Sequence, residues 1–245
     1  MEKNAYKLAA QLIKEAKNII VFTGAGISAE SGIPTFRGKD GLWNKYNPQE
    51  LATYEAFIKN PKLVWEWYDF RRQLIKKASP NKAHIILAKW EEFLPITIIT
   101  QNVDELHQRA GSKNVIELHG NIWTLKCINE NCSYKEKNYE APLKELPPIC
   151  PKCHDLLRPG VVWFGEPLPQ EALSKAFSLA QKADLCIVIG TSGVVYPAAH
   201  IPFVVKENNG KVIEINLEPT PISQISDISF FEKASSTLEK INKYM

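Results

Sequence analysis

The sequence lacks long hydrophobic runs, a strong excess of either charge, and internal repeats. Its longest apolar stretches, at 96–100 and 185–189, are far shorter than the roughly 20 residues needed to cross a bilayer. The formal charge is only +3 over 245 residues, so direct nucleic-acid binding is not indicated. Residues 1–16 have an amphipathic helix pattern without the apolar block of a signal peptide. We therefore expect a cytoplasmic protein with reduced thiols and no membrane partner.

What the chain does contain is an alternation of short apolar runs with helical patterns. Most of these runs do not alternate strictly with polar residues, which is typical of parallel strands buried on both faces of a sheet. We expect an α/β fold with strands at 18–24, 96–102, 115–120, 184–192 and 211–218. Helices are expected at 2–17, 61–78, 82–92, 169–182, 197–208 and 233–243.

Residues 121–160 differ from the rest because they hold four of the five cysteines, several prolines and no long apolar run. Two close cysteine pairs at this separation are typical of a structural Zn²⁺ site, since four thiolates complete a tetrahedral shell. The alternative is two incidental or redox-active pairs. We expect a small zinc module inserted between 1–120 and 161–245. Its ligands are Cys127, Cys132, Cys150 and Cys153.

The segment after the first expected strand begins like a dinucleotide-binding turn. Gly24, Gly26 and Ala29 match the pattern G-x-G-x-x-G/A. Pro34 then excludes a continuing helix. No clear strand with an acidic end follows about 20 residues later, as a hydride-transferring unit would need. The turn predicts a bound dinucleotide but leaves its use open.

Small, hydroxyl, amide or ionisable residues follow every expected strand. Because the carboxyl ends of parallel strands meet at one edge, these residues are expected to converge on phosphates, riboses and an amide. We expect backbone N–H groups of the glycine turn to be free for a pyrophosphate, although Gly, Asn, Asp and Ser also mark ordinary turns. In chain order the residues are Gly24, Ala25 and Gly26; Gln101, Asn102, Val103 and Asp104; His119 and Gly120; Gly190, Thr191 and Ser192; and Asn216, Leu217 and Glu218.

His119 is the residue that we expect to act as a base. It ends a strand at this same edge, and a neutral imidazole with a pKa near ~6.5 is suited to take a proton from a sugar hydroxyl. A single histidine is more often structural. His84, His107 and His200 fall on expected helices without such neighbours.

Taken in order, the motifs of the chain resemble those of the sirtuins, which are NAD-dependent protein lysine deacylases. The matching segments are GAGISAESGIPTFRG, TQNVDELHQRAG, ELHG, the cysteine pairs, RPGVVWFGE, GTS and INLE, which span 21–218. The resemblance implies a Rossmann-like domain with a small zinc module, structural Zn²⁺, and NAD as a co-substrate that loses nicotinamide. It implies acyl-lysine proteins or peptides as partners and O-acyl-ADP-ribose as a product.

The resemblance also implies catalytic roles. His119 is the general base towards the ribose, and Asn102 helps to place ribose or water. Asp104 and Val103 hold the nicotinamide amide. Two other functions stay open, namely a protein ADP-ribosyltransferase and a non-catalytic NAD- or protein-binding module.

Further contacts are implied around the co-substrate and the peptide. Phe36 shields the reacting carbon within a loop that closes over NAD, and Gln101 contacts ribose. The segment from 161 to 166 is expected to pair with the substrate peptide as a strand, with Val162 and Phe164 lining the lysine tunnel. The remaining NAD contacts are Gly24, Ala25, Gly26, Arg37, Gly190, Thr191, Ser192, Asn216 and Leu217.

Tyr68 and Arg71 have two interpretations. They are three residues apart and so share one face of an expected helix. In one interpretation Trp65, Trp67, Tyr68 and Phe70 are packing residues and Arg71 is a solvated charge. In the other, which we favour, the pair resembles that of sirtuins which remove succinyl and malonyl groups, because an arginine fork and a phenol can bind a carboxylate.

Overall fold

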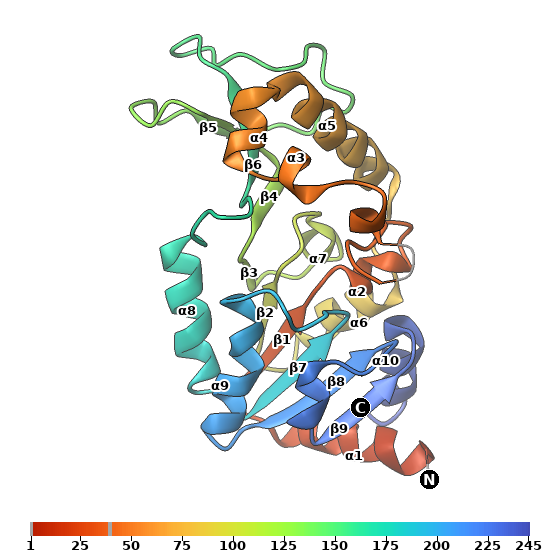
Figure 1. Ribbon diagram of the computed structural model, residues 1–245. Helices are drawn as coiled ribbons and strands as arrows, with labels where there is room; N and C mark the ends of the chain where they lie inside the picture. Colours follow the sequence, from red (N-terminus) through yellow and green to blue (C-terminus); the bar gives the residue numbers. More distant parts are fainter. Residues whose placement is uncertain (1, 39–40) are drawn as a thin grey trace.

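The computed structural model describes residues 2–38 and 41–245 and is built around a six-stranded parallel sheet (Figure 1). The strand order is β3-β2-β1-β7-β8-β9, and every neighbouring pair is parallel. The expected α/β class is therefore confirmed. In chain order the strands are β1 (Ile19–Thr23), β2 (Ile96–Thr100), β3 (Val115–Glu117), β7 (Leu185–Ile189), β8 (Lys211–Asn216) and β9 (Ile228–Phe231).

The direction in which strands are added reverses between β1 and β7. From β1 the chain adds β2 and β3 on one side, and from β7 it adds β8 and β9 on the other. This is the doubly wound, Rossmann-like order, in which ligands bind at the carboxyl edge where the order reverses. The five expected strands are all present. The sixth, β9, was not predicted, because only Phe230 of its four residues is buried.

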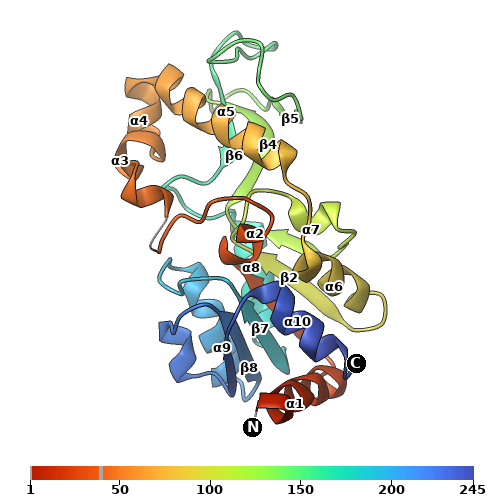
Figure 2. The same cartoon turned by 90° about the vertical axis from the view of Figure 1, so that its right-hand side faces the viewer.

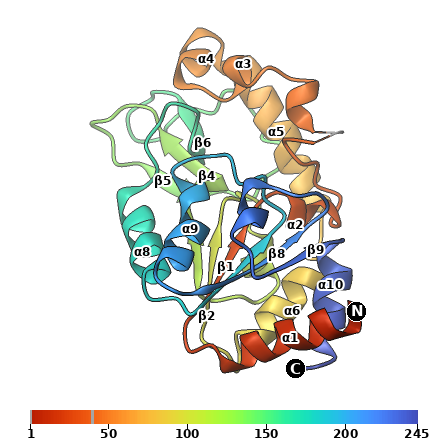
Figure 3. The ribbon, with the colours of Figure 1, turned by 60° about the horizontal axis from the view of Figure 1, so that its bottom comes forward.

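Helices cover both faces of the large sheet (Figures 2 and 3). One face carries α1 (Glu2–Glu15), α6 (Lys82–Trp90) and α10 (Ala234–Asn242), and the other carries α8 (Gln170–Ala180) and α9 (Ile201–Glu207). All five helices were expected. The helix expected at 197–208 begins with a 3₁₀ turn, Ala198–His200, and continues as α9. Within the described ranges, no helix is both long and apolar enough to cross a membrane.

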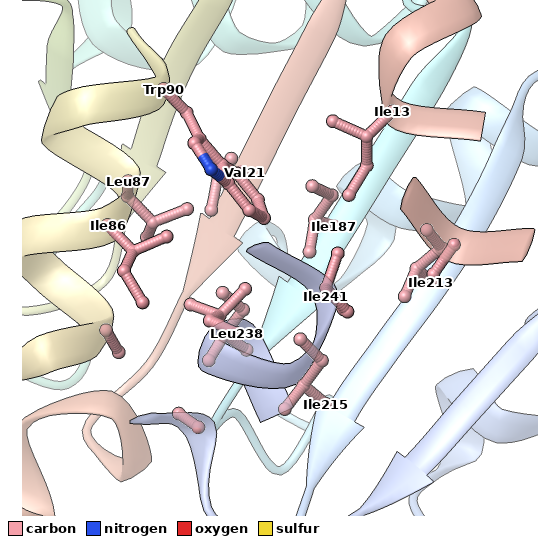
Figure 4. Packing of buried hydrophobic residues seen from close by; sticks show 14 of the residues in the cluster. Ile13, Val21, Ile86, Leu87, Trp90, Ile187, Ile213, Ile215, Leu238 and Ile241 are labelled. Carbon is pink, nitrogen blue, oxygen red and sulfur yellow. The ribbon is translucent and has the colours of Figure 1, made fainter. Parts of the chain in front are cut away.

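The two-sided cover explains the continuous apolar strands. In β1, Val21 faces the core under α1, α6 and α10 (Figure 4), and so does Ile19. Ile20 and Phe22 face the core under α8 and α9. All four side chains are at most 2% exposed. Full burial of such a side chain contributes about 1.5–3 kcal/mol to folding, so both faces of the strand hold it in register.

A second, antiparallel sheet has the order β5-β4-β6 and lies above the large sheet in Figure 1. It shares a separate hydrophobic core with three helices from the first third of the chain. The boundaries 121 and 160 of the zinc module stay a prediction. The strands are β4 (Gly120–Cys127), β5 (Lys135–Lys137) and β6 (Leu157–Val161), and the helices are α3 (Pro48–Leu51), α4 (Tyr54–Lys59) and the expected α5 (Pro61–Lys77).

The helix after β1 is short. α2 (Gly26–Ala29) ends well before Pro34, and Gly32 leaves the helical conformation with a φ of +84°. Pro34 excludes a longer helix, but the chain has already turned at the glycine. After this turn, the ring of Phe36 lies against α5, with its centroid 4.8 Å from the guanidinium of Arg71.

Candidate active site

Two glycine turns meet between β1 and β7 at the carboxyl edge of the large sheet. The N–H groups of Gly24 and Gly26 donate to the carbonyls of Ile189 and Gly190, at 3.0 and 2.8 Å. A Cβ on Gly26 would lie 2.6 Å from the Gly190 Cα, and Gly190 itself has a φ of +62°, so neither position accepts a side chain without strain. Contrary to expectation, both glycine N–H groups are used within the protein. The N–H of Ala25 has no partner among the described residues.

Amide side chains tie the strand ends to one another. The Gln101 Nε2 donates to the Thr191 Oγ1 at 2.9 Å, and the Asn216 Nδ2 donates to the Thr191 carbonyl at 2.7 Å. The Asn102 Nδ2 donates to the Gly24 carbonyl at 3.0 Å. The ends of β1, β2, β7 and β8 therefore form one hydrogen-bonded rim, as expected for parallel strands.

Asp104 lies buried beneath this rim, before α7 (Leu106–Arg109). Burial raises the pKa of its carboxyl, and hydrogen bonds from the Leu106 N–H and the Ser28 hydroxyl oppose that effect. The Ser28 Oγ donates to Asp104 at 2.7 Å and also accepts from the Asn102 Nδ2 at 3.2 Å. Sequence reasoning missed Ser28, whose only signal was a hydroxyl two residues after Gly26.

The loop around Asp104 is also anchored to the small sheet. Glu105 has a left-handed φ of +63°, which is unfavourable for a residue with a side chain. Its carboxylate accepts from the Lys137 Nζ at 2.5 Å and from the Asn121 Nδ2 at 3.2 Å. These contacts connect β5 and β4 to the loop, so the small sheet supports the backbone that carries Asp104.

His119 follows β3 and faces the loop after β2. Its Nδ1 lies 3.0 Å from the Gln101 carbonyl. A carbonyl only accepts, so Nδ1 carries the proton and Nε2 keeps its lone pair. Burial lowers the pKa of His119, partly offset by the Gln101 carbonyl. No described residue bonds to Nε2, which leaves a neutral base at the sheet edge.

Two other histidines belong to the core instead. His84 and His107 are at most 1% exposed, with ring centroids 4.9 Å apart. Burial lowers the pKa of His84 to about 4 and that of His107 well below its ordinary value. Both are neutral residues of the core, whereas His200 is exposed and ends the 3₁₀ turn that precedes α9.

The segment expected to pair with a peptide lies beside His119. The Val162 N–H donates to the His119 carbonyl, and the Phe164 N–H donates to the Ala52 carbonyl, both at 2.9 Å. Phe164 is 39% exposed. Glu166 accepts two hydrogen bonds from Arg158, at 2.5 and 2.9 Å, which fixes the end of this segment.

Three expected NAD contacts have no side-chain partner in the described part of the chain. Leu217 is 64% exposed, Arg37 is exposed, and Ser192 is half-buried beside Thr191. Phe36 is held more firmly, because its ring packs 5.1 Å from Trp43. Within the described residues, none of these four side chains belongs to the hydrogen-bond network of the rim.

Tyr68 and Arg71 project from α5 into the core of the small sheet. Tyr68 is 2% and Arg71 8% exposed, whereas Phe70 is 47% exposed. The interpretation of Arg71 as a solvated charge and Phe70 as a packing residue is therefore wrong. The Arg71 guanidinium lies 4.8 Å from the ring centroids of both Phe36 and Trp67. It makes no hydrogen bond or ion pair with any described residue.

The four cysteines of the expected zinc module meet at one point, with all Sγ atoms within 4.8 Å of one another. Cys127 and Cys153 are 3.4 Å apart, and Cys132 and Cys150 are 3.8 Å apart. A tetrahedron with Zn–S bonds of about 2.3 Å has edges of about 3.8 Å, whereas a disulfide would bring two sulfurs to about 2.05 Å. The cluster therefore fits structural Zn²⁺ and excludes two disulfides.

Removing zinc is expected to unfold the small sheet and to abolish activity with it. Structural zinc contributes about 10–16 kcal/mol in small zinc modules, and Lys137 connects this sheet to Glu105. A strong chelator should lower the first melting transition, and added Zn²⁺ should restore it. Cys150→Ser should lose the metal, while Cys186→Ala, in buried β7, should keep one zinc per chain by elemental analysis. An unchanged melting curve after chelation would contradict a structural ion.

The fold and rim define a doubly wound α/β protein whose rim lies at the point where the strand order reverses, the place where such folds bind ligands. The Sir2 family model matches residues 24–197, and the chain belongs to this family. A relative from Aquifex aeolicus (strain VF5), named NAD-dependent protein deacylase, is 64% identical over 232 residues, covering 94% of this chain and 96% of that protein.

Solved structures agree with this assignment. A complex of a Sir2 homologue with NAD has a TM-score of 0.91 at 48% identity, covering 97% of this chain and 93% of that chain. A complex of Sir2, a p53 peptide and NAD⁺ has a TM-score of 0.88 at 37% identity, covering 97% of both chains.

Proposed function

We propose that this protein is an NAD-dependent protein lysine deacylase that releases nicotinamide and O-acyl-ADP-ribose. The observation that carries the proposal is the neutral His119, whose Nε2 has no described partner and which lies beside the rim at the strand reversal. A base at this edge has no use in a purely structural protein. Family membership and the names of the relatives support the same activity.

The rim fits NAD by its chemistry. The close approach of Gly24, Gly26 and Gly190 leaves no room for side chains, which suits a pyrophosphate. The unpaired Ala25 N–H offers it a donor, and Gln101 and Asn216 offer amides to the riboses. Asp104 and Val103 would hold the nicotinamide amide. When bound, NAD supplies the sugar carbon from which nicotinamide leaves.

His119 would then act on a ribose hydroxyl. Its Nδ1–H is held by the Gln101 carbonyl, so the ring cannot change tautomer and Nε2 is the atom that accepts the proton. Asn102 is fixed by the Gly24 carbonyl and would place ribose or water. The segment from 161 to 166 would pair with the peptide, and Val162 and Phe164 would enclose the lysine.

The finer part of the proposal is that the enzyme removes succinyl and malonyl groups as well as acetyl groups. A buried cation without a close counter-charge is costly. Arg71 is buried and makes no ion pair or hydrogen bond with any described residue, although the Asp104 carboxylate attracts it electrostatically. A carboxylate on the acyl group would complete this site, since guanidinium and phenol donors both suit it.

Mass spectrometry of matched peptides tests both parts. We expect acetyl-lysine and succinyl-lysine peptides to lose their acyl groups only with NAD, with one nicotinamide and one O-acyl-ADP-ribose formed per peptide. ADP-ribose attached to protein would instead indicate a transferase. No nicotinamide release from either peptide would contradict the enzyme assignment.

A further inference from the structure

Trp163 makes a buried hydrogen bond to the phenol of Tyr68. Its indole Nε1 donates to the Tyr68 hydroxyl oxygen at 3.0 Å, and both side chains are 2% exposed. The partners are 95 residues apart in the chain. Trp163 lies in the segment that we expect to pair with substrate, between Val162 and Phe164.

This bond determines which hydrogen bonds the Tyr68 hydroxyl can still make. Indole N–H groups only donate, so Tyr68 is the acceptor here and its own O–H must donate elsewhere. No described residue accepts from it. Burial raises the pKa of Tyr68 to about 12, which keeps the proton in place at neutral pH. Tyr68 and Arg71 are therefore two buried groups of α5 with donors that the described chain does not satisfy.

Trp163 is itself held firmly. The Arg158 guanidinium lies 3.6 Å from the ring centroid, and Phe57 packs against the ring at 5.2 Å. Glu166 accepts from both Arg158 and the Trp163 backbone N–H, the latter at 2.8 Å. The indole N–H consequently has a fixed direction, and so has the lone pair of Tyr68 that it occupies.

We propose that Trp163 is a positioning residue for acidic acyl groups. Its N–H orients the Tyr68 hydroxyl as a donor that binds the acyl carboxylate together with Arg71. An acetyl group has no carboxylate and does not use this donor. The inference rests on the proposed function and adds a residue that discriminates between acyl groups without touching them.

The test compares kcat/KM for succinyl-lysine and acetyl-lysine peptides of one sequence. Trp163→Phe keeps an aromatic ring and removes one N–H, so we expect the succinyl-to-acetyl ratio to fall about tenfold, mainly through KM for the succinyl peptide. Trp65→Phe is the matched control, because Trp65 also donates one buried hydrogen bond, to the Leu157 carbonyl at 2.7 Å. It should leave the ratio unchanged.

A double variant separates positioning from packing. If Trp163 acts through the phenol, Trp163→Phe should not change the ratio further in a Tyr68→Phe background. A ratio that stays at the wild-type value in Trp163→Phe, or that falls again in the double variant, overturns the inference. A wild-type enzyme that removes acetyl but no succinyl groups overturns the acyl part of the proposed function, and this inference with it.

NMR of the six tryptophan indoles gives an answer even where Trp163→Phe does not fold. One indole N–H resonance should shift in Tyr68→Phe. In the wild type, that same resonance should move when succinyl-lysine peptide binds in the presence of ADP-ribose, but not when acetyl-lysine peptide binds. Equal responses to the two peptides would show that the bond does not report on the carboxylate, and would overturn the inference.

Discussion

His119→Ala is expected to lower kcat for deacylation about 10²–10⁴-fold, the range that a positioned general base supplies, while the protein stays folded. The Nδ1 of His119 contacts only the Gln101 carbonyl, and Nε2 contacts no described residue. The substitution therefore removes only one described hydrogen bond, so most of the stability should be kept. Steady-state kinetics with an acetyl-lysine peptide and a melting curve measure the two effects separately.

The pH profile of the wild type adds a second measurement. A base must be neutral, so the rate falls as the pH drops through its pKa. Burial lowers the pKa of His119 below its ordinary value of 6.5, so the acidic limb of kcat/KM should lie below pH 6.5 and should be absent from the residual rate of His119→Ala. His200→Ala, at an exposed position just before α9, is the control. A near-normal rate in His119→Ala would remove His119 from the mechanism.

The large sheet could be predicted because its strands carry their own signal. β1 and β7 each consist of five consecutive buried residues. Apolar runs of this kind between helices indicate parallel strands. β5 carries no such signal, since its residues are Lys135, Glu136 and Lys137, all exposed. It is a strand only because β4 pairs with it. The small sheet therefore depends on tertiary contacts that local pattern does not encode.

The candidate site, too, could be predicted only in part from the sequence. Residues that directly follow strands could be placed, because topology brings the carboxyl ends of parallel strands together. The contacts of Ser28 with Asp104 and of Trp163 with Tyr68 join residues 76 and 95 positions apart, and neither has a local signature. The sequence singled out Arg71 by its spacing from Tyr68, but it could not show that Arg72 is hydrogen-bonded whereas Arg71 is not.

Arg71 and Arg72 are both buried but differ in their hydrogen bonds, and the prediction for Arg71→Met rests on this difference. Arg72 is fully buried but donates to the carbonyls of Ile122, Asn138 and Glu140 at 2.7–2.8 Å. Arg71 is also buried, yet its guanidinium lies near the rings of Phe36, Trp67 and Tyr68 and makes no hydrogen bond with any described residue. Arg72 therefore ties the helix to the backbone of the small sheet, whereas Arg71 is a cation without a hydrogen bond or ion pair in the described chain.

Arg71→Met is therefore expected to lower kcat/KM for a succinyl-lysine peptide at least about a hundredfold, since charged hydrogen bonds contribute about 1.5–3 kcal/mol each. Deacetylation should persist, because an acetyl group offers no charge to bind. The same change should also raise the melting temperature by about 2–4 °C, as expected for about 1 kcal/mol in a chain of this size, because an unpaired buried charge is replaced by an apolar side chain of similar length.

Arg72→Met is the matched control one residue away. It leaves one buried and two half-buried carbonyls without their donor. It should therefore destabilise the protein by about 3 kcal/mol or more without changing the succinyl-to-acetyl ratio of the folded fraction. Opposite effects of two adjacent arginines on stability, with specificity changed by only one of them, would separate ligand recognition from packing. Equal destabilisation by both variants would mean that Arg71 supports the core, and the succinyl and malonyl part of the proposal would be lost.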